Sequence, residues 1–308
     1  MDPLSALISL MRPRTIVSKI VSGAGRWGVR YPSVGSAGFG VVLTGSCHFH
    51  VQGCGPVRLV AGDFVLLPSA PSFVMASDPE FDPESIEPNI SPGSSVGVHH
   101  GDAGSMPDFE LLGGYFHFNP ANAPLLTQIL PTMIHVRRAE TTAQRLANTI
   151  GFLTEEARTS RPGRDLVLER LIEVLLIEAL RYRPEQTGMH IRPGLLAGLA
   201  DDRIGRALAS FHADIAQAWS VASLADEARL SRTTFSERFT RLVGVPPMTY
   251  LLQWRMAVAK DILQSERLQQ DAVAAMIGYG SASAFSTAFR REIGQAPGEY
   301  ARTVMALA

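Results

Sequence analysis

Residues 231–250 read SRTTFSERFTRLVGVPPMTY, and residues 281–300 read SASAFSTAFRREIGQAPGEY. The two stretches align in one register, in which every pair of identical residues lies 50 positions apart. The pairs are Ser231 and Ser281, Phe235 and Phe285, Ser236 and Ser286, Phe239 and Phe289, Arg241 and Arg291, Gly244 and Gly294, Pro247 and Pro297, and Tyr250 and Tyr300. Agreement of glycine, proline and aromatic positions together predicts two copies of one supersecondary unit.

The first copy has the pattern of a short helix, a turn and a longer helix. We expect the short helix over Val221–Ala228. Ser231 is placed to cap the second helix, and Gly244 is placed to end it. Phe235 and Phe239 lie four residues apart and so predict the buried face of that second helix. The first copy is therefore a predicted helix-turn-helix unit.

The second copy repeats the pattern. We expect a short helix over 272–277, a turn at 278–280, and a helix that Ser281 caps and Gly294 ends. Between the copies, residues 248–265 predict a single helix with apolar residues on both sides. A rigid helix there fixes the separation of the two units. Two such units on one chain can enter successive major grooves on one face of DNA.

The residues that face away from the phenylalanines are mostly small, polar or basic. Such side chains fit a major groove and reach base edges or phosphates. The predicted DNA-binding residues are Arg232, Thr233, Ser236, Glu237 and Arg241 in the first copy and Ser283, Thr287, Arg290 and Arg291 in the second. The positive charge of the first helix includes a third arginine, Arg238. An alternative interpretation is a helical protein-interaction domain, which predicts no affinity for DNA.

The first part of the chain has a different pattern. From Val17 to Asn119, short β-like runs alternate with Gly, Pro and Ser, as in a β-barrel or sandwich. Residues 76–108 predict a long loop that contains a short strand near Val96-Gly97-Val98. Helical periodicity follows, with helices expected over 143–157 and 166–182. We therefore predict an α+β multidomain protein, with a β-barrel and a helical hairpin over 1–182, a linker over 183–202 and a tandem helix-turn-helix domain over 203–308.

Residues 203–304 resemble the DNA-binding domain of the AraC/XylS family of bacterial transcription regulators. The motifs that carry the resemblance are Leu224-Ala225-x-x-Ala228, Ser231-x-x-x-Phe235-x-x-x-Phe239, Gly244-x-x-Pro247-x-x-Tyr250, Arg255 with Ala259, Ile277-Gly278-Tyr279, and Pro297-x-x-Tyr300. The resemblance implies binding to double-stranded promoter DNA, action on RNA polymerase, and activation rather than repression. Glu237 departs from many relatives, which carry a basic or amide residue there; an acidic side chain can accept from cytosine N4.

The N-terminal part resembles the cupin-like sensor domains that precede this DNA-binding domain in one branch of the family. The likeness lies in Asp2-Pro3-Leu4-Ser5-x-Leu7, Ala61-Gly62-Asp63-x-x-Leu66-Leu67-Pro68 and Leu112-Gly113-Gly114-x-Phe116-x-Phe118. It implies a cupin-like β-barrel that receives a small-molecule effector, followed by helices that often mediate dimerisation. We therefore expect a ligand-responsive regulator, not an enzyme, with the helix over 167–180 as the candidate homodimer interface.

Histidines and cysteines in the first part leave alternatives open. His48 and His50 share one face of an expected strand, and His117 lies on another, a pattern found in metal-dependent cupin enzymes and metal sensors. No Glu follows His50 within several residues, so we expect neither a metal nor another cofactor. Cys47 and Cys54 raise a redox sensor as a further alternative; a buried, hydrophobic role for Cys47 is the simpler interpretation.

Composition and charge limit the class of protein further. The chain has 308 residues, with 28 Lys+Arg against 29 Asp+Glu and a formal net charge of -1, so a DNA-binding surface must be local. Its 2 cysteines cannot form a disulfide framework, which fits a reducing compartment. The apolar run over 167–180 is broken by charged residues and cannot cross a bilayer. We therefore expect a cytoplasmic protein.

Overall fold

The computed structural model describes residues 1–33, 35–87, 97–119, 122, 130–138, 144–159, 161–181, 193–265 and 268–307. The chain divides into two compact units. The β-sheet unit consists of Arg12–Phe118 and Pro131–His190, and the helical unit consists of Met1–Met11, Asn119–Leu130 and Ile191–Ala308. Residues 182–192 of the predicted linker lie outside the described residues.

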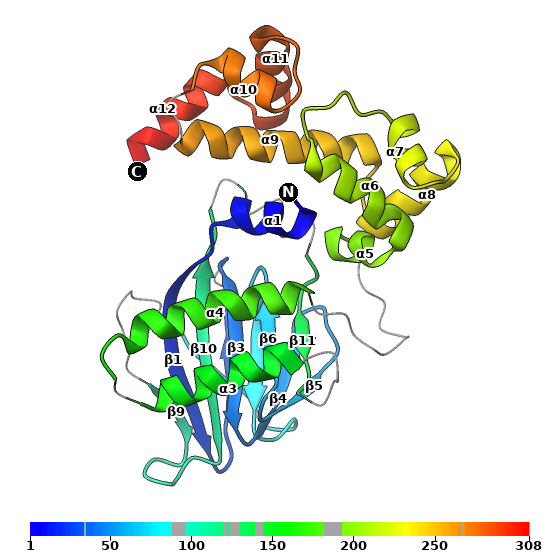
Figure 1. Ribbon diagram of the computed structural model, residues 1–308. Helices are drawn as coiled ribbons and strands as arrows, with labels where there is room; N and C mark the ends of the chain where they lie inside the picture. Colours follow the sequence, from blue (N-terminus) through cyan, green and yellow to red (C-terminus); the bar gives the residue numbers. More distant parts are fainter. Residues whose placement is uncertain are drawn as a thin grey trace. The chain divides into compact units, whose positions relative to one another are not determined.

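The described strands of the β-sheet unit form two sheets (Figure 1). The larger sheet has the order β11-β6-β3-β10-β1-β9, with β1 (Arg14–Ala24), β3 (Ala37–Thr44), β6 (Phe64–Leu67), β9 (Val98–Gly101), β10 (Phe109–His117) and β11 (Ile134–Val136). The smaller sheet has the order β5-β4-β7-β2-β8, with β2 (Gly28–Tyr31), β4 (Ser46–Val51), β5 (Val57–Val60), β7 (Phe73–Ala76) and β8 (Glu84–Ser85). The predicted cupin-like β domain is confirmed, but among the described strands no ladder closes the two sheets into a barrel.

Side chains of both sheets fill the space between them. Along β4, Cys47, Phe49 and Val51 are buried, whereas the residues between them are half-buried or exposed. This alternation is the pattern of a strand with one face on the core. The core joins these residues to others from the larger sheet, including Leu111 and Tyr115. The sequence pattern thus identified a β region, and the structure defines its inner face.

The predicted helical hairpin lies on the outer face of the larger sheet (Figure 1). It consists of α3 (Gln144–Arg158) and α4 (Arg164–Arg181), within two residues of the bounds expected from periodicity. The buried side of α4 comprises Leu168, Ile172, Leu175, Leu176, Ala179 and Leu180. These residues cover one side of the helix, and Val167 and Val174 on the other side stay exposed.

The turn between β5 and β6 is fixed by a buried carboxylate. Gly62 has φ 91, a left-handed conformation that favours glycine. Asp63 is 2% exposed and accepts the backbone N–H of Val60 over 3.2 Å and that of Arg138 over 3.0 Å. Nε2 of His135 lies 3.0 Å from the same carboxylate. Asp63 therefore links the turn between β5 and β6 to strand β11 and the residues that follow it.

The predicted loop over 76–108 contains two short strands. β8 pairs with β2, and β9 pairs in parallel with β1. β8 is exposed, and β9 alternates half-buried and exposed residues. β9 (Val98–Gly101) begins at the last residue of the short strand expected near Val96-Gly97-Val98, whereas the two polar residues of β8 give no strand pattern. Residues 88–96 of this segment lie outside the described residues.

The helical unit contains the predicted helix-turn-helix repeat. Its helices are α1 (Pro3–Met11), α5 (Leu195–Ala200), α6 (Asp202–Ala213), α7 (Val221–Glu227), α8 (Arg232–Val243), α9 (Pro247–Ser265), α10 (Gln270–Met276), α11 (Ala282–Ile293) and α12 (Pro297–Leu307). Helix α9 runs between the two helix-turn-helix units (Figure 1). Tyr250 and Trp254 are buried near its start, and Met256 and Ile262 pack in the core of the second unit.

Residues from the beginning and middle of the chain complete the helical unit. Helix α1 packs on α6 and α9, and Leu7 is fully buried. The side chain of Asn119 donates to Gln264 of α9 over 2.8 Å. The division into domains over 1–182 and 203–308 stays a prediction. By their contacts, Met1–Met11 and Asn119–Leu130 group with the helical unit, because the apolar side of a helix shows that it needs a partner but does not identify which one.

Candidate nucleic-acid interface

The long helices α8 and α11 are held by two aromatic clusters of the same design. In the first unit, the rings of Phe235 and Phe239 lie 5.5 Å apart, and Tyr250 lies 5.8 Å from Phe239. In the second unit, Phe285 and Phe289 lie 5.5 Å apart, and Tyr300 lies 5.5 Å from Phe289. The predicted inner faces of both helices are confirmed. Their opposite faces are therefore directed away from the cores.

Both helices begin and end at the expected residues. The hydroxyl of Ser231 accepts the backbone N–H of Thr234 over 3.2 Å, and the hydroxyl of Ser281 accepts that of Ala284 over 3.2 Å. Gly244 and Gly294 end the helices with φ 88 and φ 86. Each cap contributes about 1 kcal/mol. These caps fix which residues occupy the first turn of each helix.

The turns that precede the long helices differ between the copies. In the first turn, Arg229 adopts a left-handed conformation with φ 53, and in the second turn Gly278 does so with φ 79. Guanidinium groups of Arg203 and Arg206 donate to the carbonyl oxygens of Arg229 and Ala228. These hydrogen bonds support a conformation that costs a non-glycine residue about 1 kcal/mol. The second turn is one residue longer, because α10 ends five residues before Ser281 whereas α7 ends four before Ser231.

The predicted DNA-binding residues lie on the outer faces of α8 and α11. Exposed side chains are Arg232, Thr233, Glu237 and Arg241 on α8 and Ser283, Thr287, Arg290 and Arg291 on α11, and Ser236 is half-buried. The hydroxyl of Thr287 donates to the carbonyl of Ser283 over 3.0 Å. Arg291 donates to Glu292 over 2.8 Å, an exposed ion pair of small energetic value. The helices thus present polar and basic groups, as the sequence predicts.

One arginine of α8 has a different role. Arg238 donates from Nε to Asp201 over 2.9 Å, and Asp201 caps helix α6. Burial acts to raise the pKa of Asp201, but hydrogen bonds from Arg238 and two backbone N–H groups outweigh it and lower the pKa. Arg238 therefore ties α8 to α6. Because Asp201 neutralises Arg238, the net positive charge that α8 presents to a partner is lower by one than the sequence of the helix suggests.

Two further residues, both distant from the outer faces, position the helices. Arg255 of α9 donates to the carbonyl oxygens of Ile215 and Gln217 over 2.9 and 2.7 Å, which fixes the segment between α6 and α7. His212 is buried, and its Nε2 lies 2.8 Å from the hydroxyl of Tyr250. Burial is the main cause that lowers the pKa of His212 to about 3. No local pattern in the sequence identifies His212.

Two of the three candidate metal ligands of the β-sheet unit lie outside its core. His48 is half-buried and His50 is exposed, and both lie on the side of β4 opposite its buried residues. His117 ends β10, and its side chain lies outside what the structure describes. The described residues contain no group of three or more His, Cys, Asp or Glu side chains placed to hold a metal ion. The sequence predicted the shared face of His48 and His50, but not that it points away from the core.

Neither cysteine forms a disulfide in this structure, and their environments differ. Cys47 is buried, and Cys54 is partly exposed. Burial raises the pKa of the Cys47 thiol to about 12, so the thiolate is scarce near neutral pH. Cys47 therefore acts in this structure as a small buried hydrophobic residue.

None of the described helices combines the length and apolarity that a membrane span requires.

Comparisons with known proteins agree with this architecture. A Cupin family model matches residues 2–183, and a Helix-turn-helix domain model matches residues 224–303. A putative AraC-like transcription regulator of Streptomyces lividans is 36% identical over 306 residues, covering 97% of this chain and 98% of the relative. A second one, of Streptomyces antibioticus, is 34% identical over 310 residues, covering 99% of this chain and 100% of the relative.

A solved structure of the DNA-binding domain of AdpA, a global transcriptional factor, in complex with a target DNA is 30% identical to this chain. The matched region covers 34% of this chain and 96% of the AdpA domain, with a TM-score of 0.33. Fold and family models together define a DNA-binding transcription regulator with a cupin domain and a helix-turn-helix domain. The chain belongs to the family of AraC-like transcription regulators.

Proposed function

We propose that this chain is a ligand-responsive activator that binds specific promoter sequences through α8 and α11. The observation that carries the proposal is the pair of capped helices, each buried on its phenylalanine side and polar on the other. Two such helices on one chain match the use of helix-turn-helix units in DNA recognition, in which the second helix enters the major groove. The comparisons point to a regulator rather than an enzyme.

The proposed DNA-binding residues form two groups, one that contacts base edges and one that contacts phosphates. Near the start of α8, Arg232, Thr233, Ser236 and Glu237 are placed to read base edges, as Ser283, Thr287 and Arg290 are on α11. Arginine can bond guanine at two atoms, and the Glu237 carboxylate can accept from cytosine N4. Arg241 and Arg291, in the last turns, suit phosphate contacts that position the helices.

The remaining parts of the proposal concern signal and assembly. The β-sheet unit receives a small-molecule effector, and the occupied state favours a DNA-binding or polymerase-contacting arrangement. An exposed apolar stripe on α4, Val167 and Val174 with the half-buried Leu171 between them, supports a homodimer. Activation through RNA polymerase in the cytoplasm follows from the family resemblance.

The experiment that tests promoter binding is a fluorescence-anisotropy titration of the full chain. The probes are DNA from upstream of its own gene and a scrambled duplex of equal composition, each across a salt series. We expect preferential binding to the native sequence, with affinity that falls as salt rises. Arg290→Ala and Arg232→Ala should each weaken specific binding by about 1–3 kcal/mol.

A matched control is Arg161→Ala, because Arg161 is an exposed arginine in the turn between α3 and α4. This variant loses the same charge and should bind DNA as the unmodified chain does. Equal affinity for both duplexes at every salt concentration, unchanged in Arg290→Ala, would contradict the proposal and favour the protein-interaction alternative.

A further inference from the structure

One threonine on the outer face of α11 has its hydroxyl group turned back onto the helix. The hydroxyl of Thr287 donates to the carbonyl oxygen of Ser283, four residues earlier, over 3.0 Å. Such a bond holds the side chain in one of the rotamers that a helical threonine adopts, and it uses the donor hydrogen within the helix. The Cβ atom of threonine carries only a hydroxyl, a methyl and a hydrogen. The group that this exposed side chain offers outward is therefore its methyl.

A second methyl group lies beside it. Ala284 is exposed and comes three residues before Thr287, so the two side chains are neighbours on the surface of the helix. The backbone N–H of Ala284 donates to the capping hydroxyl of Ser281 over 3.2 Å, which fixes the place of this pair relative to the start of the helix. The two methyl groups form a small apolar spot on a face whose other exposed residues carry polar or charged groups.

The first copy has no such spot at the same positions. The residues 50 positions earlier are Thr234 and Glu237. The hydroxyl of Thr234 lies 2.9 Å from that of Ser231, and Glu237 places an exposed carboxylate where Thr287 places a methyl. The inner faces of α8 and α11 share one design, but their outer faces differ in chemistry at this point. The two helices are therefore suited to different base pairs.

The first turn of α11 allows a close approach to DNA. Its residues Ala282, Ser283 and Ala284 are all small, whereas α8 begins with Arg232. A threonine methyl extends only a short way from the helix backbone, so it reaches a base edge only when the helix lies deep in the groove. The major groove admits an α-helix, and the base that presents a methyl group there is thymine. Alanine and threonine methyl groups pack on that methyl.

We propose that Thr287 and Ala284 select a thymine in the bound DNA by contact with its 5-methyl group. The Thr287 hydroxyl keeps its bond within the helix and gives no hydrogen bond to the base. A cytosine at the same place lacks the methyl group and leaves the apolar spot without a partner. The inference rests on the proposed function, because it needs α11 in the major groove, and it makes Thr287 a residue that determines specificity.

The test removes one methyl group at a time from the DNA. The probe is the upstream duplex of the anisotropy experiment, with each thymine replaced in turn by deoxyuridine, which lacks only the 5-methyl group. At least one replacement should weaken binding of the full chain by about threefold to tenfold, the factor for burial of a methyl-sized group. This loss should disappear in Thr287→Ser, which lacks the methyl, and persist in Thr287→Val, which keeps it.

The affinities for the unmodified duplex complete the cycle. Thr287→Ser should bind it more weakly by about the factor that deoxyuridine costs the unmodified chain, and Thr287→Val should bind it within about threefold of that chain. Both variants should fold, because Thr287 is exposed, and thermal unfolding checks this. The matched control is Thr303→Ser. Thr303 is also exposed and donates to the carbonyl oxygen of Glu299 over 3.0 Å, but it lies on α12. This control should leave every deoxyuridine effect unchanged.

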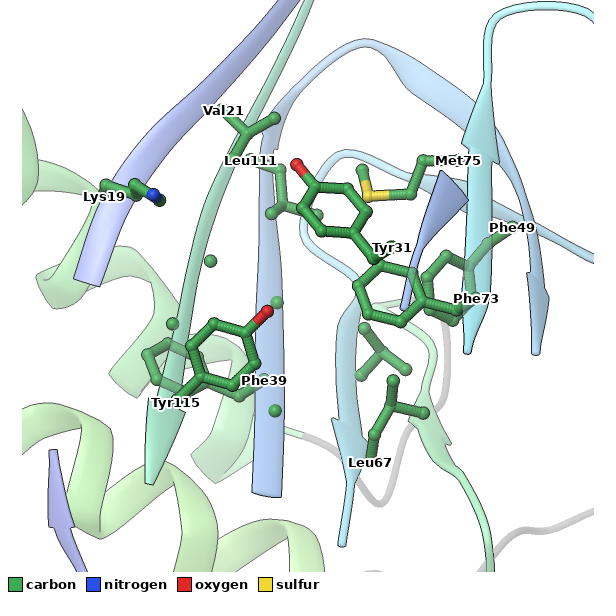
Figure 2. Close-up of a pocket in the computed structure, with 15 residues that line it drawn as sticks. Lys19, Val21, Tyr31, Phe39, Phe49, Leu67, Phe73, Met75, Leu111 and Tyr115 are labelled. Atoms are coloured by element: carbon green, nitrogen blue, oxygen red, sulfur yellow. The ribbon is translucent and has the colours of Figure 1, made fainter. Parts of the chain in front are cut away.

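The substitutions do not alter the β-sheet unit. A cavity of about 60 Å³ lies between its two sheets, with Tyr31, Phe49 and Met75 among its lining residues (Figure 2). Thr287 belongs to the helical unit, so its variants keep this lining intact. A difference between Thr287→Ser and Thr287→Val, measured without added effector, therefore reports the contact with DNA and not the ligand response proposed for the β-sheet unit.

Two results would overturn the proposal. One is a scan in which every deoxyuridine effect is the same in Thr287→Ser as in the unmodified chain. The other is full affinity in Thr287→Ser with a loss in Thr287→Val, which would mean that the hydroxyl contacts the DNA. Preference for the upstream duplex in either case keeps the proposed function and removes this contact alone. Equal affinity for the upstream and scrambled duplexes removes the proposed function and this contact with it.

Discussion

Arg238 of α8 donates from Nε to the carboxylate of Asp201 over 2.9 Å, and that carboxylate also accepts the backbone N–H groups of Arg203 and Ile204. One acidic side chain therefore caps α6 and anchors α8 at the same time. This ion pair ties α8 to α6, whereas the proposed contact with DNA involves the arginines at exposed positions of α8.

The first prediction separates these two roles. Arg238→Ala should destabilise the helical unit by about 1–2 kcal/mol, because it leaves a partly buried carboxylate with one partner fewer. Arg241→Ala, on the exposed side of the same helix, should leave stability within about 0.5 kcal/mol and weaken DNA binding. Chemical denaturation and anisotropy measure the two effects. A variant pair with the opposite pattern would show that Arg238 faces DNA.

The second prediction compares two glycines with the same backbone conformation. Gly278 and Gly294 have φ 79 and φ 86. A Cβ added at Gly278 lies 2.3 Å from the carbonyl oxygen of Ala216, whereas one added at Gly294 meets nothing within 4 Å. Gly294→Ala should cost about 1–2 kcal/mol from backbone strain alone, and Gly278→Ala should cost clearly more. Equal losses in thermal unfolding would mean that the turn relaxes around Ala216.

The third prediction concerns pH. His212 has a pKa of about 3 in the folded chain and an ordinary value of 6.5. Between these two values the unfolded chain binds a proton that the folded chain does not, so stability should fall as the pH falls from 6.5 toward 3. The slope from this group is at most about 1.4 kcal/mol per pH unit. His212→Gln should flatten the profile, as measured by denaturation at several pH values.

The matched control for pH is His50→Gln, because His50 is exposed on the β-sheet unit. Its profile should follow that of the unmodified chain. A Trp27→Phe background confines the fluorescence signal to Trp219 and Trp254 of the helical unit, since the chain has 3 tryptophans. An unchanged slope in His212→Gln would mean that His212 is not the group that controls acid stability.

The fourth prediction tests the place of α1. Leu7 is fully buried where α1 packs on α6 and α9. Leu7→Ala should destabilise the helical unit by about 2–5 kcal/mol and leave the β-sheet unit unaffected. Hydrogen exchange resolved by peptide measures both units in one sample. Loss of protection in the β strands, with the helical unit unchanged, would place α1 with the β-sheet unit instead.

Local patterns predicted much of the interface. The caps at Ser231 and Ser281 and the inner faces set by the phenylalanines follow from spacings of three and four residues, and the structure confirms them. The sequence does not distinguish Arg238 from the other basic residues of α8, because its partner Asp201 lies 37 positions away. Pairings at that distance depend on the tertiary fold. That DNA contacts lie on these faces stays a prediction.

The β-sheet unit was less predictable for a related reason. A strand shows two alternating faces, but a shift by one residue exchanges the inner face for the outer. The sequence therefore grouped His48 with His50 correctly and could not say that they point away from the core.

The division of the chain among the two units has a consequence for its synthesis. The helical unit is assembled from three separate segments, and α1 is made well before α9, on which it packs and whose last residue is Ser265. At about 5–20 residues per second, α1 leaves the ribosome well before its partner exists. The apolar side of α1 must remain without its native contacts during that time, while the strands of the β-sheet unit pair. Folding of the DNA-binding part is therefore completed only after α9 has been made.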